Sequence, residues 1–147
     1  FPFKIQVSGR IKHFINAFGE ELIIENAEFA LTKACKKHHV GIKEYTAAPI
    51  YFSEGQAGGH EWLIEFEKEP KDLEAFVLSL DEALKEANSD YEAKRYNSYN
   101  IRAPLVRKAP KDLFYTWLKN KGKLGGQHKV PRLSNDRQHL EELLKLI

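Results

Sequence analysis

The chain of 147 residues contains no methionine and a single cysteine. One cysteine can form neither an internal disulfide nor a multi-cysteine zinc site, so we expect a protein of a reducing compartment, the cytoplasm. The first four residues, Phe-Pro-Phe-Lys, lack the basic and apolar parts of a signal peptide. No apolar run approaches the roughly 18 residues of a membrane span, so we expect no membrane contact. Without a methionine at Phe1, we expect a piece of a longer protein.

Net charge is also small, at +2, but it is unevenly distributed. Residues 94–137 contain 12 basic and two acidic side chains, whereas residues 1–93 contain 10 basic and 17 acidic ones. Such a basic segment indicates a surface that faces nucleic acid, phosphate or an acidic partner. The other interpretation is a solvated face that is balanced by the acidic half of the same domain. Charge alone slightly favours this second interpretation.

Hydrophobic periodicity predicts a single α+β domain over residues 1–147. The predicted strands cover residues 3–7, 10–18, 40–52, 60–67 and 105–108, and the predicted helices cover 23–38, 70–87, 90–95, 110–122 and a closing segment that begins at the Asn135–Gln138 capping pair. The first two strands would form a β-hairpin within residues 1–19. Cys35 lies on the apolar stripe of the first helix, where we expect it to fill the core. The element order predicts helices packed on a mostly antiparallel sheet.

Most catalytic and metal-binding patterns are missing. The chain has no zinc-protease, nucleophile-elbow or Walker-type motif. His38 and His39 are adjacent and point in different directions, so we predict no metal site. Glu20 and Glu21 are interpreted as solvated carboxylates rather than as a catalytic pair. The glycines of residues 53–59 join two strands, which favours a flexible hairpin loop over a phosphate-binding loop.

Two segments remain as candidates for chemistry. Arg10 and Lys12 lie in a short basic strand that precedes Gly19, and glycine permits backbone turns that other residues resist. Lys129 lies in a glycine-rich loop and is followed by Pro131, so its ammonium group is suited to swinging onto a phosphate. An exposed lysine in a mobile loop is an equally natural interpretation of the same spacing.

These segments resemble known enzymes. Residues 9–22, Gly-Arg-Ile-Lys-His-Phe-Ile-Asn-Ala-Phe-Gly-Glu-Glu-Leu, resemble the hinge motif of the adenylate-forming (ANL) superfamily. Leu-Asp-Glu-Ala-Leu at 80–84, Asn-Ser-Asp-Tyr-Glu-Ala-Lys-Arg at 88–95 and Gln-His-Lys-Val-Pro-Arg at 127–132 resemble the C-terminal domain of the auxin-responsive Gretchen Hagen family of acyl-acid-amido synthetases. The resemblance covers nearly the whole chain. It implies the small, mobile C-terminal domain of a larger enzyme, inactive by itself.

The resemblance also implies a reaction. Such enzymes activate an acyl acid with ATP and Mg²⁺, bound mostly by a large N-terminal domain, and then transfer the acyl group to the amine of an amino acid. The N-terminal domain would be the partner of this domain, with the acyl acid and the amino acid as substrates. The implied roles are a hinge at Arg10, Lys12 and Gly19, a catalytic lysine at Lys129 that neutralises charge at the α-phosphate, and phosphate-facing positions at Lys123 and Arg132.

Two alternatives stay open. A generic acyl-CoA ligase domain would differ only in its acceptor, coenzyme A instead of an amine. A basic nucleic-acid-binding or partner-binding module is the other alternative. Phe114 and Trp117 lie on a helical apolar stripe rather than interleaved with basic residues, so we expect no nucleic-acid partner. The sequence leaves the acyl acid, the amino acid and the oligomeric state open.

Overall fold

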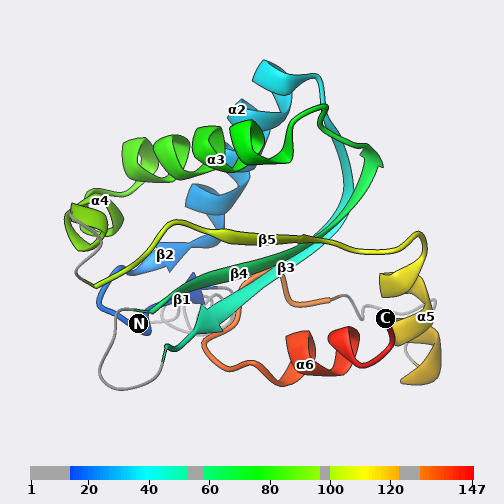
Figure 1. The fold of residues 1–147 in the computed structure, drawn as a ribbon. Coiled ribbons are helices and arrows are strands. Elements are labelled where there is room, and N and C mark those ends of the chain that lie inside the picture. The colour runs from blue at the N-terminus through cyan, green and yellow to red at the C-terminus, as the bar shows by residue number, and fades with distance from the viewer. Residues whose placement is uncertain (1–13, 53–57, 97–99, 123–129) are drawn as a thin grey trace, which may run out of the picture.

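A computed structural model gives the fold of the chain and describes residues 14–52, 58–96, 100–122 and 130–147 (Figure 1). The elements, in chain order, are β1 (Phe14–Ile15), β2 (Leu22–Ile23), α2 (Ile24–His38), β3 (Gly41–Ile50), β4 (Gly59–Lys68), α3 (Leu73–Ala87), α4 (Ser89–Arg95), β5 (Leu105–Lys108), α5 (Leu113–Asn120) and α6 (Gln138–Leu144). The predicted α+β class is confirmed.

The main sheet has the strand order β3-β4-β5. β3 and β4 form a long antiparallel pair, in which Thr46 lies opposite Leu63. β5 runs parallel to β4, with Leu105 opposite Glu61. A parallel return requires a long crossover connection, and α3 and α4 supply it. The sheet is therefore antiparallel along its longest pair and parallel at one edge.

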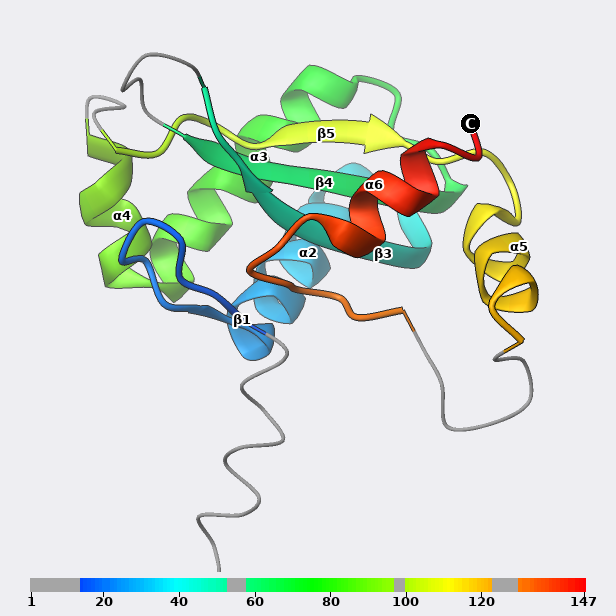
Figure 2. The same ribbon diagram turned by 90° about the horizontal axis from the view of Figure 1, so that it is seen from below.

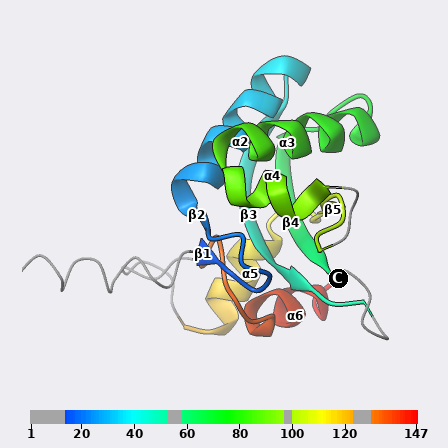
Figure 3. The same cartoon turned by 90° about the vertical axis from the view of Figure 1, so that its left-hand side faces the viewer.

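Both faces of the main sheet are buried. Side chains alternate between the two faces along a strand, so Trp62 packs in the core with α2 and α3 while Leu63 packs with α5 and α6. On the neighbouring strand β3, Ala47 packs in the same core as Trp62, and Ala48 packs in the same core as Leu63. Figures 2 and 3 show helices on both sides of the sheet. The domain thus has three layers, with the sheet in the middle.

The second helical layer changes the environment of β4. Residues 60–67 alternate apolar and acidic side chains, a pattern typical of a strand with one solvated face. α5 and α6 cover that face, and Glu61 and Glu65 are only 1% and 2% exposed. Glu61 binds Arg107 and Arg137, and Glu65 Oε2 accepts a 2.8 Å hydrogen bond from the Asp112 amide. The buried carboxylates therefore tie the helical layer to the sheet.

Polar side chains begin α3 and α4. Asp72 accepts a hydrogen bond from the Ala75 amide at 3.2 Å, as the helix start predicted after Pro70 requires. Asn88 ends α3 and also caps α4, because its Oδ1 accepts a 2.7 Å bond from the Tyr91 amide. One asparagine thereby fixes the corner between two consecutive helices.

Two predicted helix starts are wrong. The helix expected from Pro110 begins at Leu113, because Asp112 adopts a left-handed conformation with φ of +64° and its amide is bound to β4. The last helix begins at Gln138 after Arg137, so Asn135 does not form the predicted capping box. Asn135 Oδ1 instead accepts a bond from a distant part of the chain, described below.

The predicted hairpin over residues 1–19 falls largely outside the described residues. Its described end differs from the prediction, since β1 covers only Phe14–Ile15 and pairs antiparallel with β2. The chain turns between these two short strands, so Gly19 lies inside the turn rather than at the end of a strand. We call residues 16–21 the β1–β2 turn.

Candidate functional site

The structure describes two of the six predicted site residues, Gly19 and Arg132. Arg10, Lys12, Lys123 and Lys129 lie outside the described residues. The described residues nearest to them in the sequence form two segments. These are residues 14–16, which follow Lys12, and residues 130–135, which follow Lys129.

The β1–β2 turn is closed by its own side chains. Gly19 has a φ of +85°, a conformation that favours glycine, and a Cβ placed on it would lie 3.2 Å from Lys94 Cε. Asn16 Oδ1 accepts a 3.1 Å bond from the Glu21 amide, and Glu20 Oε1 accepts a 2.7 Å bond from the Phe18 amide. The turn therefore has a defined shape without a regular hydrogen-bonded ladder.

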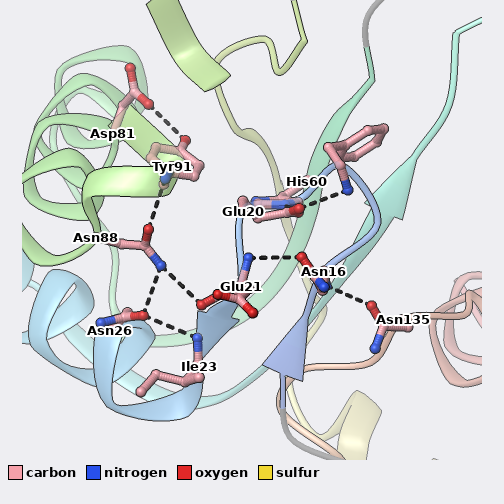
Figure 4. Close-up of polar contacts among 11 residues, drawn as sticks. Asn16, Glu20, Glu21, Ile23, Asn26, His60, Asp81, Asn88, Tyr91 and Asn135 are labelled. Atoms are coloured by element: carbon pink, nitrogen blue, oxygen red, sulfur yellow. Dashed lines mark hydrogen bonds and ion pairs between the residues drawn. The ribbon is translucent and has the colours of Figure 1, made fainter. Parts of the chain in front are cut away.

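Glu20 is buried, which corrects the prediction of a solvated carboxylate. Its side chain is 0% exposed, and its Oε2 lies 2.6 Å from His60 Nε2 on β4 (Figure 4). The imidazole ring stacks on Tyr91 of α4, with 5.7 Å between the ring centroids. Glu21, the next residue, is exposed as predicted. The two adjacent carboxylates thus point in different directions, and only one enters the domain.

The α4 segment holds the turn from the other side. Asn88 Nδ2 donates a 3.0 Å hydrogen bond to the Glu21 carbonyl. Tyr91 donates a 2.8 Å bond to Asp81 on α3, and the Arg95 guanidinium forms a fork with the same carboxylate at 2.8 and 2.5 Å. The predicted 80–84 and 88–95 motifs therefore bind one another and support the turn.

One hydrogen bond joins a residue that follows Lys12 to a residue that follows Lys129. The Asn16 amide donates to Asn135 Oδ1 at 2.7 Å across 119 positions of sequence (Figure 4). Asn16 follows the predicted hinge residues, and Asn135 follows Lys129 by six positions. Leu133 also bridges to Ala47 of β3, which fixes this stretch against the main sheet. Asn16 and Asn135 are therefore held side by side next to the main sheet.

Arg132 is held by two carboxylates. Its Nε lies 3.2 Å from Glu44 Oε1, and its Nη1 lies 3.4 Å from Glu28 Oε2. The guanidinium also lies over the Tyr45 ring, 5.2 Å from its centroid, and the Tyr45 hydroxyl donates to Glu28. Burial opposes the charged form of Arg132, but Glu44 and Glu28 raise its pKa above the ordinary value. Burial and the bond to Glu28 raise the pKa of Tyr45 as well.

These groups line a shallow groove between α2 and β3. The groove has a volume of about 320 Å³, and its floor includes Leu31, Cys35 and Val40. Cys35 packs against the main core, as predicted, and burial raises the pKa of its thiol. Every charged group that we name around Arg132 is paired with a neighbour.

The basic segment at residues 94–137 is largely neutralised within the domain. Six of its ten described basic side chains form ion pairs with acidic side chains of this chain: Arg95, Arg107, Lys108, Lys121, Arg132 and Arg137. Several partners come from the acidic first part of the sequence, such as Asp81 and Glu61. This pairing favours the interpretation of a balanced face.

Residues 14–52, 58–96, 100–122 and 130–147 contain no group of three or more His, Cys, Asp or Glu side chains that could hold a metal ion. Among the same residues, none of the helices has both the length and the apolar character needed to cross a bilayer.

A comparison with known protein families identifies the family of this chain. A family model described as the GH3 family C-terminal domain matches residues 25–138, which is more than half of the chain. The chain belongs to the GH3 family. The matched range includes α2 to α5 and the main sheet, together with Arg132 and the segment that contains Lys129. The resemblance to the Gretchen Hagen family is confirmed.

Solved structures share the fold of this GH3 domain. "AtGH3.15 acyl acid amido synthetase in complex with 2,4-DB" matches 91% of the chain with a TM-score of 0.70 at 16% identity. "GH3.15 acyl acid amido synthetase" matches 92% with a TM-score of 0.70 at 18% identity. The chain spans about a quarter of each of those proteins, 25% and 26% of their chains. A comparison with curated protein sequences found no match.

Sequence reasoning missed two buried polar groups of the GH3 domain. His60 lies two positions before the apolar Trp62 and therefore on the same face of the strand, and this spacing could have predicted its burial. Asp81 lies within the apolar stripe of α3, three residues before the buried Leu84. An acid at such a position requires a partner, and Arg95 supplies it.

Proposed function

We propose that this GH3 domain is the mobile C-terminal part of an ATP-dependent acyl acid amido synthetase. The observation that carries the proposal is the family match over residues 25–138 in a fold that acyl acid amido synthetases share. The domain would not act alone, because the large domain would hold most of the acyl and nucleotide pocket. We further propose that the enzyme acts in the cytoplasm.

The proposed reaction has two half-reactions. A carboxylate oxygen of the acyl acid attacks the α-phosphorus of ATP, and pyrophosphate leaves. The amine of an amino acid then attacks the acyl carbon, AMP leaves with the bonding electron pair, and the amine loses a proton. Following the family resemblance, we propose that the large domain binds most of the ATP and its Mg²⁺.

Lys129 is the catalytic residue of the proposal. Negative charge grows on the α-phosphate oxygens during adenylation, and a lysine brought in by domain closure would stabilise that charge. The Asn16–Asn135 bond supports this assignment, because it keeps the segment after Lys129 beside the segment after the hinge residues. Of the three predicted hinge residues, Gly19 lies inside the closed β1–β2 turn, so rotation at Arg10 and Lys12 would move the lysine loop with the domain.

Two further basic residues have secondary roles in the proposal. Lys123 would face phosphate from the same loop as Lys129. Arg132 would do so only after leaving Glu28 and Glu44, the carboxylates that hold it in the present state. We therefore expect Arg132 to contribute less to adenylation than Lys129.

The proposal is tested by ATP–pyrophosphate exchange with the full-length protein and a panel of acyl acids. We expect exchange with at least one acid, and a loss of about 100-fold in Lys129→Ala, the effect typical of removing one preorganised charge-stabilising group. Lys119→Ala is the matched control, since Lys119 is an exposed lysine of α5. Absence of exchange with every acid would contradict the synthetase proposal, and full exchange in Lys129→Ala would exclude this lysine from the mechanism.

The acceptor is tested separately by product analysis. Mass spectrometry of reactions that contain acyl acid, ATP and a mixture of amino acids should detect an amide. Parallel reactions with coenzyme A should give no thioester. The opposite result would favour the generic acyl-CoA ligase alternative.

A further inference from the structure

We propose that Glu20, His60 and Asn88 are positioning residues that hold the β1–β2 turn rigidly against the domain, so that the chain following the hinge rotates together with it. The inference rests on the proposed function for its catalytic consequence. Its structural part concerns only the contacts of the turn, so the two can fail separately.

The first contact is a buried polar pair. Glu20 and His60 side chains are 0% and 1% exposed, although Glu20 belongs to a short turn near the start of the domain. Burying a carboxylate costs several kcal/mol unless hydrogen bonds compensate it, and apolar side chains would often fill such a space at lower cost. Both Glu20 oxygens are used, one by the Phe18 amide at 2.7 Å and one by His60 at 2.6 Å. The pair therefore specifies one conformation of the turn.

The surroundings of His60 define the hydrogen bond. Nδ1 of His60 is buried and has no hydrogen-bond partner among the described residues. A carboxylate only accepts hydrogen bonds, so in its bond to the Glu20 carboxylate the His60 Nε2 is the donor. Tyr91 stacks on the ring and is itself fixed by its bond to Asp81, so the imidazole is held in orientation.

The second contact reaches the turn from α4. Asn88 Nδ2 donates to the Glu21 carbonyl at 3.0 Å and to Asn26 Oδ1 at 3.1 Å. Its Oδ1 independently caps α4 through the Tyr91 amide. Asp is as good a helix cap as Asn, but it cannot donate. Asn88→Asp therefore removes the contact with the turn while it preserves the helix cap.

These contacts matter because the strands beside them are short. β1 and β2 have two residues each and form a separate two-stranded sheet. An isolated ribbon of this kind is marginally stable by itself. Ile15 and Leu22 anchor the two strands in the main core, and Glu20 and Asn88 anchor the turn between them to β4 and to the start of α4. The consequence is a rigid connection between the segment after Lys12 and the body of the domain.

The test uses three variants of the full-length protein. Glu20→Gln preserves shape but replaces the carboxylate, and Asn88→Asp removes the donor to the turn. Glu21→Gln is the matched control, because Glu21 is the adjacent residue of the turn and is exposed. Adenylation is measured by ATP–pyrophosphate exchange, amide formation by single-turnover transfer from the preformed acyl-adenylate, and local opening by amide hydrogen exchange of the peptide that contains residues 14–21.

We expect amide exchange in residues 14–21 to accelerate at least tenfold in Glu20→Gln and Asn88→Asp, and to change less than twofold in Glu21→Gln. The ratio of the amide-forming rate to the adenylation rate should change at least fivefold in the first two variants only. A merely structural role would lower both rates together and leave the ratio unchanged, which would overturn the positioning role.

The two proposals remain distinguishable. If wild-type protein shows no adenylation with any acyl acid, the synthetase proposal fails and amide exchange alone decides whether the turn is anchored by these residues. If amide exchange in both variants equals that of wild type, the anchoring is refuted whatever the activity. Should Glu20→Gln fail to fold, Asn88→Asp gives the same decision without touching the buried pair.

Discussion

Replacing Asp81 by asparagine should cause a large loss of stability with little change in shape. Asp81 is 2% exposed on α3 and receives the guanidinium fork of Arg95 and the hydroxyl of Tyr91. Lys85 Nζ lies farther away, at 3.7 Å. The Asp81→Asn variant keeps one carbonyl oxygen for these donors, but its amide group presents N–H to a guanidinium. Arg95, with a side chain 11% exposed, would then face a neutral partner.

The magnitude follows from burial. Removing one partner of a buried ion pair costs about 3–5 kcal/mol, because the other charge stays desolvated. Since asparagine retains an acceptor, we expect the lower limit of that range, about 3 kcal/mol. In a domain of this size, each kcal/mol lowers the melting temperature by about 2–4 °C, so the expected decrease is about 6–12 °C.

Urea denaturation of the purified chain, followed by circular dichroism and by tryptophan fluorescence, measures the loss. Glu82→Gln is the matched control, because the adjacent Glu82 side chain is 74% exposed and meets Lys85 at 3.3 Å. An exposed pair of this kind contributes at most about 1 kcal/mol. Equal midpoints for Asp81→Asn and Glu82→Gln would refute the conclusion that the Asp81 cluster stabilises the corner between α3 and α4.

The stability difference between wild type and Asp81→Asn should also depend on pH. Burial alone would raise the pKa of Asp81, but the hydrogen bonds from Arg95 and Tyr91 outweigh it and place the pKa below the ordinary value. A carboxyl with a lowered folded-state pKa stabilises the fold above its unfolded pKa of about 4, and this stabilisation is lost as pH falls through the folded value. The stability difference between wild type and Asp81→Asn should therefore be full at pH 7 and should shrink as pH falls below about 4.

Two other substitutions test packing and the second helical layer. Gly58→Ala should destabilise the chain by about 1–3 kcal/mol, because the added Cβ would overlap the Phe18 ring. Gly59→Ala is the control, since the atom nearest to its added Cβ lies 3.6 Å away. Equal melting temperatures for the two variants would contradict this packing. Glu61→Gln should cost about 1.5–3 kcal/mol by weakening the charged hydrogen bonds with Arg107 and Arg137, which stay partly solvated. Glu67→Gln, at an exposed position of the same strand, should cost less than about 0.5 kcal/mol. Chemical denaturation of each pair checks the difference.

The layers of the fold could be predicted because they depend on periodicity. The stripes of α2 and α3, the β3–β4 hairpin and the short β5 follow from the spacing of apolar residues, and the structure confirms them. Periodicity could not show that β4 has two buried faces. Glu61 and Glu65 look solvated in the sequence, and only the packing of α5 and α6 makes them interior residues. Long-range partners decided the burial of those carboxylates.

The candidate site depended even more on long-range contacts. Asn135 has the spacing of a helix cap but binds Asn16 instead, across 119 positions. Glu20 has the local pattern of a surface residue but is enclosed by β4 and α4. Local rules predict the environment of a residue from its neighbours in the sequence. The hydrogen-bond partners of these two side chains include residues that are distant in the sequence and close in space. Their side-chain types suit both roles, so no local signal separates the two.

The motifs behind the family resemblance have a structural meaning that bears on function. Within residues 88–95, Asn88, Tyr91 and Arg95 all bind groups of the turn, of α4 itself or of Asp81. This part of the resemblance therefore coincides with contacts that fix the β1–β2 turn. If the domain rotates between half-reactions, as we propose, these contacts would carry the β1–β2 turn along with the body of the domain.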